Sequence, residues 1–227
     1  MKVPRHIGII PDGNRRYSEK FNISIEKAYA KGIEKLMDVI KWSKEKGIKI
    51  ITVWGFSLEN FKRSAAEKRL LFKMFENKIK ELINSGTFEK ARVCVKIIGH
   101  RELFPRFLQE TISKLEASTS SFKSQTLNIA LGYSGRQDII DACNRIISSG
   151  IKRIDVKSFP KFLTSFSVSD PDLVIRTSGE IRTSGFFPWQ TVYSEFVFLK
   201  PLWPEITKRD FEYAINEFSK RQRRFGR

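Results

Sequence analysis

The sequence predicts an α/β fold, in which a mostly parallel sheet of about six strands is flanked by helices. Short apolar runs alternate with longer amphipathic stretches along the 227 residues, which is typical of successive βα units. Several of the apolar runs end in polar turns that contain glycine. No linker, low-complexity tract or long repeat interrupts this alternation, so we expect a single domain over residues 1–227.

In the first half of the chain, three buried strands alternate with two helices. In order, these elements are Ile7–Pro11 (strand), Ile25–Lys46 (helix), Ile48–Phe56 (strand), Ala65–Asn84 (helix) and Val93–Ile98 (strand). The strands are short continuous apolar runs, as expected for a sheet covered on both faces. In the first helix Leu36, Val39 and Ile40 recur at helical spacing, and Gly47 is a typical stop.

The second half continues the pattern with three strands and three helices. Its elements are Glu102–Ser118 (helix), Thr126–Leu131 (strand), Gln137–Ser148 (helix), Leu173–Arg176 (strand), Phe196–Leu199 (strand) and Thr207–Arg224 (helix). In the last helix, Phe211, Ile215 and Phe218 form an apolar face within an otherwise basic segment. Parallel strands place their carboxyl ends at one edge, so the polar turns that follow them are expected to converge on one ligand site.

The composition limits the location of the protein and the ligands that it attracts. The net charge of +17 favours the binding of polyanions, which include nucleic acid, anionic membranes and phosphorylated metabolites. Cys94 and Cys143 lack metal-ligand spacing, and we interpret them as small hydrophobic residues in a reducing compartment. The N-terminus lacks the apolar segment of a signal peptide, and no apolar run approaches the length of about 18 residues that spans a membrane. We therefore expect a cytoplasmic protein and leave open a peripheral contact with an anionic membrane.

The turn after the first strand combines a carboxylate, a glycine and two arginines. Asp12 cannot bind phosphate directly, but a carboxylate can hold Mg²⁺ against substrate phosphates. Gly13 lets the backbone approach a ligand, and Arg15 and Arg16 supply planar donors for phosphate oxygens. Taken alone, this turn is more often a surface turn with an Asp–Arg pair than a ligand site.

Two later segments have a similar character. Residues 56–64 mix aromatic, acidic, amide and basic side chains just after a strand, which suits either a pocket wall or an ordinary loop. Residues 172–186 place arginines and hydroxyl groups among glycines after another strand and form a second candidate anion site. The basic tail from Arg221 is interpreted either as a frayed helix end or as a contact for nucleic acid or anionic lipid.

These segments together resemble the cis-prenyltransferase family, which includes undecaprenyl diphosphate synthase and dehydrodolichyl diphosphate synthase. The matching segments occur in order along nearly the whole chain, and they are HIGIIPDGNRRY, TVWGFSLENFKRS, GYSGR, DPDLVIRTSGEIRTSGFFPWQTVYSEF and LWPEI with the terminal RRFG. The first two are closer to the archaeal and eukaryotic branch than to the bacterial one. The family's enzymes condense isopentenyl diphosphate with an allylic diphosphate primer in cis geometry.

The resemblance also implies roles for individual residues. Asp12 is expected to be catalytic and to organise Mg²⁺, with Glu195 as a second acidic group contributed across the interface of a homodimer. The allylic diphosphate is expected to bind to the loop residues Gly13, Asn14, Arg15 and Arg16. Asn60 and Arg63 are expected to assist ionisation and proton removal. Isopentenyl diphosphate is expected to bind to Arg176, Arg182 and Ser184, joined by Arg224 and Gly226 from the neighbouring subunit.

The expected product is a long-chain polyprenyl diphosphate, the precursor of a glycosyl carrier lipid, built on a farnesyl or geranylgeranyl diphosphate primer. The growing chain needs an apolar tunnel between the sheet and the helices. Its candidate walls are Phe21, Phe56, Leu58 and the helical residues 33–42 and 70–83. No DDxxD motif occurs, which argues against the all-helical trans-prenyltransferases.

The chain departs from the family pattern in its first long helix. The family often has an Arg and a His where this chain has Ile25 and Tyr29, and Lys27 or Lys31 is a candidate to compensate. Two other functions were weighed. A non-catalytic partner subunit would lack several of the motif residues that are present here, and a nucleic-acid-binding module would be expected to carry a recognition motif that this sequence lacks.

Overall fold

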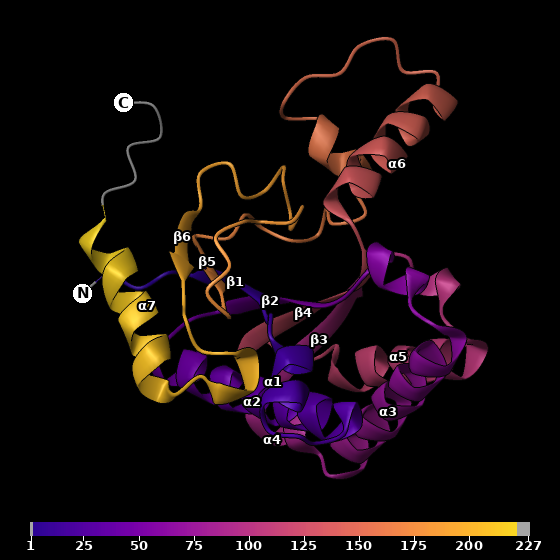
Figure 1. Ribbon diagram of the computed structural model, residues 1–227. Coiled ribbons are helices and arrows are strands. Elements are labelled where there is room, and N and C mark those ends of the chain that lie inside the picture. The colour runs from indigo at the N-terminus through magenta and orange to yellow at the C-terminus, as the bar shows by residue number, and fades with distance from the viewer. Residues whose placement is uncertain (1, 222–227) are drawn as a thin grey trace.

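Six parallel strands form one continuous sheet at the centre of the computed structural model, which describes residues 2–221 (Figure 1). The strands are β1 (His6–Ile10), β2 (Ile50–Ser57), β3 (Val93–Ile98), β4 (Gln125–Tyr133), β5 (Leu173–Arg176) and β6 (Glu195–Phe198). Their order across the sheet is β3-β4-β2-β1-β5-β6. All five pairings are parallel, so the polar turns after β1, β2, β4 and β5 lie at the same edge. The predicted α/β class and parallel sheet are confirmed.

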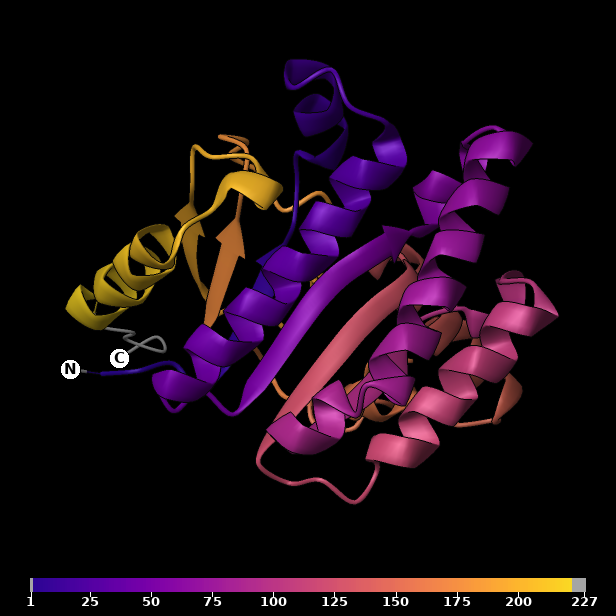
Figure 2. The same ribbon diagram turned by 90° about the horizontal axis from the view of Figure 1, so that it is seen from below.

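The helices cover the two faces of the sheet unequally. They are α1 (Asn14–Lys20), α2 (Ile25–Glu45), α3 (Ala65–Asn84), α4 (Thr87–Ala91), α5 (Arg106–Thr119), α6 (Gly135–Ser148) and α7 (Lys208–Lys220). Helices α2, α3 and α5 lie across one face (Figure 2), whereas α6 and the long loops around β5 lie on the other side (Figure 1). Helix α7 lies beside β6 at the sheet edge. No helix in the described part of the chain is both long and apolar enough to cross a membrane.

Alternation along each strand divides the core into two layers. Ile9, Val53 and Leu127 belong to the cluster under α2 and α3. On the opposite side, Val174 packs with Phe186 and Phe187 from the loop after β5. Because both faces of the sheet are covered, its central strands are apolar along their length, as the sequence predicts.

A polar network is buried among the strands on the face opposite α2. The Nε2 atom of His6 lies 2.7 Å from the hydroxyl of Thr52, and Asn128 donates to that same hydroxyl at 3.0 Å. Burial lowers the pKa of His6 to about 4, so the ring is neutral at physiological pH. These hydrogen bonds satisfy the polar groups within the sheet and give His6 a structural role.

The element boundaries differ from the predicted ones where turn chemistry decides them. The helix predicted to begin at Glu102 begins at Arg106, because Pro105 occupies its N-cap and residues 101–103 form a separate 3₁₀ turn. The short helix α4 was not predicted, since five residues carry too little periodicity to be recognised. The last helix is described as far as Lys220, and the predicted residues 222–224 lie outside the described part.

Candidate active site

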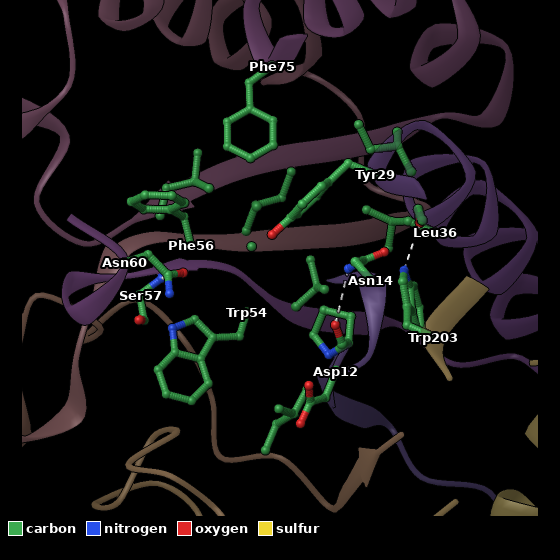
Figure 3. Close-up of a pocket in the computed structure, with 18 of the residues that line it drawn as sticks. Asp12, Asn14, Tyr29, Leu36, Trp54, Phe56, Ser57, Asn60, Phe75 and Trp203 are labelled. Carbon is green, nitrogen blue, oxygen red and sulfur yellow. Dashed lines mark hydrogen bonds between the residues drawn. The ribbon is translucent and has the colours of Figure 1, made fainter. Parts of the chain in front are cut away.

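A cavity of about 930 Å³ lies between the sheet and helices α2 and α3, and it opens at the edge where the strands end. Its mouth is lined by the turns after β1, β2, β4 and β5, which bring together residues distant in sequence, such as Asp12, Asn60 and Arg176. Its depth is lined by apolar side chains that include Phe75, Leu82 and others from the sheet and helices (Figure 3). One cavity therefore has a charged end and an apolar end.

Asp12 lies at the charged end, two residues after β1. Its Oδ2 atom accepts a hydrogen bond from Nη2 of Arg176 at 2.9 Å, and its Oδ1 atom lies 3.4 Å from Nη2 of Arg16. Burial opposes ionisation of Asp12, but the hydrogen bond and charge of Arg176 together with the charge of Arg16 outweigh it, so the pKa of Asp12 lies below its ordinary value. Asp12 is therefore an anion at neutral pH.

The turn that carries Asp12 depends on the glycine that follows. Gly13 has a φ of +113°, and a Cβ atom there would approach Leu202 to 3.0 Å, so other residues would be strained. Helix α1 starts at the next residue, Asn14, and the turn places Asn14, Arg15 and Arg16 at the cavity. The Nδ2 atom of Asn14 donates to the carbonyl of Pro11 at 3.4 Å (Figure 3). The four loop residues predicted after Asp12 thus all line the cavity.

The loop after β5 brings a second set of predicted residues to the same mouth. The buried guanidinium of Arg176 donates to the hydroxyl of Ser184 at 2.8 Å and to the carbonyl of Arg182. Ser184 and Ser178 have φ values of +53° and +75°, a left-handed conformation that is uncommon outside glycine. Such backbone strain is often found where the surrounding structure holds a loop for function. Arg176, Arg182 and Ser184 all line the cavity.

Glu180 links the two groups of arginines, and sequence reasoning did not single it out. Its Oε1 atom accepts from Nη1 of Arg16 at 3.2 Å, and its Oε2 atom pairs with Arg182. Glu180 and Asp12 thereby hold three arginines, Arg16, Arg176 and Arg182, in place. The sequence signal for Glu180 was an acidic residue among the glycines and arginines of RTSGEIRTSG. Its contact with Arg16 could not be predicted, because it depends on how the β5 loop packs against α1.

The turn after β2 supplies the remaining two predicted residues of the mouth. The short helix η1 (Leu58–Lys62) starts with a capping box, in which the Oδ1 atom of Asn60 accepts from the backbone N–H of Ser57 at 3.0 Å. Arg63 follows this helix, donates to the hydroxyl of Tyr29 at 2.8 Å, and lies 3.2 Å from Oε1 of Glu67. Asn60 and Arg63 both line the cavity.

Glu59, Ser134 and Arg136 also line the mouth, and none of them was predicted individually as a site residue. Burial raises the pKa of Glu59, but hydrogen bonds from its own backbone N–H and from Ser57 and Ser134 lower it overall. Glu59 is therefore a further anion at the mouth, next to Asn60. Glu59 and Asn60 are part of the motif TVWGFSLENFKRS, but only the fold shows that Ser134, from the turn after β4, hydrogen-bonds Glu59.

One predicted residue, Glu195, is not brought to this cavity within one chain, and two others lie outside the described residues. Glu195 starts β6 opposite Leu173, the first residue of β5, whereas Asp12 and Arg176 lie at the other end of these strands. Its Oε2 atom accepts from Nη1 of Arg221 at 3.1 Å. Arg224 and Gly226 lie outside the described residues. The roles predicted for these three residues depend on a second subunit and stay predictions.

The donor set at the mouth fits Mg²⁺ better than a metal that needs a full protein cage. Within residues 2–221, no group of three or more His, Cys, Asp or Glu side chains could hold a metal ion. Asp12 provides an ionised carboxylate whose side chain is 30% exposed at the mouth. Mg²⁺ characteristically takes one or two carboxylates and completes its shell with waters and substrate phosphates.

The predicted walls of the apolar part are partly confirmed. Phe56 lines the cavity, as do Ile33, Leu36 and Met37 of α2 and Phe75, Lys78, Ile79 and Leu82 of α3. Phe21 and Leu58 do not, because Phe21 lies at the end of α1 as a residue that is 48% exposed and Leu58 starts the turn η1. A continuous tunnel stays a prediction.

Comparison with known proteins places this arrangement among enzymes of one kind. A family model described as "Putative undecaprenyl diphosphate synthase" matches residues 10–226. A tritrans,polycis-undecaprenyl-diphosphate synthase (geranylgeranyl-diphosphate specific) of Thermoplasma acidophilum is 44% identical over 99% of this chain and 89% of its own length. An isoprenyl transferase of Thermus thermophilus is 40% identical over 99% of this chain and 89% of its own. The crystal structure of lavandulyl diphosphate synthase from Lavandula x intermedia, in complex with dimethylallyl diphosphate, superimposes with a TM-score of 0.92 at 30% identity and covers 99% of both chains.

Proposed function

Because the chain belongs to the undecaprenyl diphosphate synthase family of cis-prenyltransferases, and is therefore an enzyme that elongates prenyl diphosphates, we propose that it builds a long-chain polyprenyl diphosphate from isopentenyl diphosphate and an allylic primer. Of the two primers left open by the sequence, we favour geranylgeranyl diphosphate, since several of the relatives are named as specific for it. We further propose that the product is the precursor of a glycosyl carrier lipid.

The observation that carries the proposal is the single cavity with two unlike ends. Arg16, Arg176 and Arg182 surround the mouth, which suits two diphosphate groups held side by side. The apolar end, lined by residues such as Phe75 and Ile79, suits a hydrocarbon chain that must leave water. A phosphate-binding protein without a lipid product would need only the first of these ends.

In the proposed reaction, the bond between the allylic carbon and its diphosphate oxygen breaks while the double bond of isopentenyl diphosphate attacks that carbon. A proton then leaves the isopentenyl unit for a diphosphate oxygen, and diphosphate is released. Arg15, Arg16 and Arg63 would stabilise the negative charge that grows on the departing diphosphate. The Oδ1 atom of Asn60 is engaged by Ser57, which leaves its amide N–H groups to orient a diphosphate oxygen.

Asp12 is the residue that we propose to hold Mg²⁺ at the mouth. When bound there, the ion would neutralise part of the diphosphate charge. Asp12 lies between Arg16 and Arg176, so its carboxylate is already fixed at the meeting point of the two proposed diphosphate sites. Arg176, Arg182 and Ser184 would hold isopentenyl diphosphate on the side of the β5 loop.

We also propose that two copies of the chain form the working enzyme. Exposed apolar side chains occur on α6, in the loop that follows it and just before β6, and they include Ile140, Ile147, Val156 and Val192. Burying such side chains against a second copy would remove them from water, and Val192 lies three residues before Glu195. The net charge of +17 further supports peripheral contact with an anionic membrane, where an apolar product must go.

The test is an assay of the purified chain with labelled isopentenyl diphosphate and either farnesyl or geranylgeranyl diphosphate, with Mg²⁺ or with a chelator. We expect labelled polymer that depends on Mg²⁺, forms faster with geranylgeranyl diphosphate and shows cis double bonds by NMR. Light scattering of the same sample should give the mass of a dimer. The proposal fails if neither primer yields polymer in the presence of Mg²⁺.

A further inference from the structure

Arg63 occupies the border between the charged and the apolar ends of the cavity. It follows the turn after β2, and only 18% of its side chain is exposed. Its guanidinium carbon lies 5.9 Å from the centre of the Phe56 ring, which belongs to the apolar wall. The position is suited to act where an allylic carbon would meet its diphosphate, provided that the guanidinium is held in one orientation.

Tyr29 from α2 reaches this guanidinium across the cavity. Its hydroxyl accepts a hydrogen bond from Nη1 of Arg63 at 2.8 Å, so α2 is tied to the turn after β2 although the two residues are 34 positions apart. Figure 3 shows the ring of Tyr29 directed from α2 into the cavity, with its oxygen on the inner side. The ring packs against the aromatic cluster that contains Phe56 and Phe72. Tyr29 is therefore fixed by packing before it contacts Arg63.

The two polar partners of Arg63 differ in charge. Glu67, four residues later, lies 3.2 Å away and neutralises part of the guanidinium charge. Tyr29 is a neutral acceptor and restrains the guanidinium while leaving its charge available to a ligand. Lys27 and Lys31 of the same helix do not line the cavity, so Tyr29 is the polar side chain that α2 directs at Arg63 within the described residues.

We propose that Tyr29 is a positioning residue, which holds the Arg63 guanidinium toward the allylic diphosphate. The inference rests on the proposed function and assigns a role to a position at which this chain departs from the family pattern. A long side chain such as arginine loses considerable rotamer freedom when it is fixed, and a donor fixed beforehand stabilises developing charge without reorganising. The hydroxyl of Tyr29 supplies this restraint at Nη1, the atom that also contacts Glu67, so that Nε and Nη2 are the atoms that would donate to the diphosphate.

The test is a double-mutant cycle on Tyr29→Phe and Arg63→Ala. Tyr29→Phe keeps the ring and its packing but removes the acceptor, so we expect kcat to fall about tenfold while the KM for either substrate changes less than about twofold. Arg63→Ala should lower kcat by a larger factor. In the Arg63→Ala background, Tyr29→Phe should then cause no further loss, because a residue that acts through Arg63 has nothing left to position.

Tyr213→Phe is the matched control, since Tyr213 is a 53% exposed residue on α7, away from the cavity. It should keep the wild-type kcat, and all variants should keep the wild-type melting temperature. Multiplicative losses in the double variant, or a wild-type kcat for Tyr29→Phe, would overturn the positioning role while the proposed function stands. An inactive wild-type chain would instead overturn the proposed function and, with it, this inference.

Discussion

The charged and apolar ends of the cavity are held in place by different forces. At the charged end, Arg176 pairs with Asp12 at 2.9 Å, Arg182 pairs with Glu180, and Arg16 lies near both carboxylates. At the apolar end, the positions depend on contact between rings, such as Phe56 against Phe72 and Phe104 with ring centres 5.6 and 5.8 Å apart. The first end is fixed by directional charge pairs and the second by shape.

This difference implies that substitutions at the two ends should affect different measurements. A directional pair places one atom toward a ligand, so its loss should appear in kcat or in the KM for one substrate. A packed wall limits the space for a chain, so a change there should appear in product length while turnover persists. The predictions below test this division, beginning with the largest expected effect.

The strongest test of the charged end is Asp12→Asn. The amide is isosteric with the carboxylate and can still accept from Arg176, but it removes the charge proposed to hold Mg²⁺. We expect kcat to fall about 10³-fold, measured as labelled polymer formed at saturating substrate. Circular dichroism should show the wild-type spectrum, because Arg176 keeps its bonds to Ser184 and to the carbonyl of Arg182. A kcat within tenfold of the wild type would remove Asp12 from the chemistry.

Arg182→Ala should act on binding more than on turnover. Arg182 lies at the mouth on the side proposed for isopentenyl diphosphate, so we expect its loss to raise the KM for that substrate roughly thirtyfold with little change in kcat. Arg106→Ala is the matched control, because Arg106 is exposed on α5 outside the cavity. A rise confined to the KM for the allylic primer would show that the two diphosphate sites have been assigned the wrong way round.

A pH experiment distinguishes the titration of His6, which is buried in the sheet, from that of Asp12 at the mouth of the cavity. The folded pKa of His6, about 4, lies below its ordinary value, so the unfolded chain binds more protons as pH falls from 6.5 toward 4. The free energy of unfolding should therefore drop by about 2 kcal/mol between pH 7 and pH 5. Asp12 should stay ionised over this range, since its pKa is lowered. The protein that remains folded should therefore keep the negative charge of Asp12 at the mouth of the cavity.

Urea unfolding of the wild type and His6→Gln at pH 7 and pH 5 measures this effect. The variant carries no group at position 6 that titrates in this range, so its stability should change less with pH than that of the wild type. Equal changes in both proteins would show that acid sensitivity arises elsewhere than in the network of His6, Thr52 and Asn128.

At the apolar end, Ile79→Phe should alter the product rather than the rate. Ile79 lies on α3 at the cavity wall, and the larger ring would shorten the space available to the chain. We expect mass spectrometry to show a product shorter by at least one five-carbon unit, with kcat within about threefold of the wild type. Leu103→Phe is the control, since Leu103 is half exposed outside the cavity. An unchanged length would indicate that the chain does not reach α3.

The same division explains how far the sequence alone could lead. Asp12 was predicted from its polar turn after an apolar strand, whereas the roles of Asn60 and Arg176 were implied by the family resemblance; parallel strands bring all three to one edge. Tyr29 was noted only as a departure from the family pattern, and Glu180 was not singled out, because their contacts with Arg63 and Arg16 follow from the packing of α2 and the β5 loop. The residues at the strand ends could be predicted from sequence motifs, whereas the contacts across the cavity could be found only in the folded structure.

For the apolar end, the sequence predicted which helices form the wall but not which of their side chains face the cavity. Residues 33–42 and 70–83 supply wall residues, but periodicity could not distinguish those that face the cavity from those that pack in the core. Phe21 and Leu58 were assigned to the wall because they are apolar and near a motif, and both lie elsewhere. Apolar character alone does not give direction, because the shape of a cavity depends on every packed neighbour.

The most direct test of the central claim is a crystal structure with Mg²⁺ and geranylgeranyl thiolodiphosphate, an analogue that ionises slowly. The two-ended cavity predicts that the diphosphate contacts Arg16 and the metal beside Asp12 while the hydrocarbon runs between α2 and α3 toward Ile79. A structure in which the hydrocarbon lies on the outer surface, with the diphosphate away from Asp12, would contradict the claim.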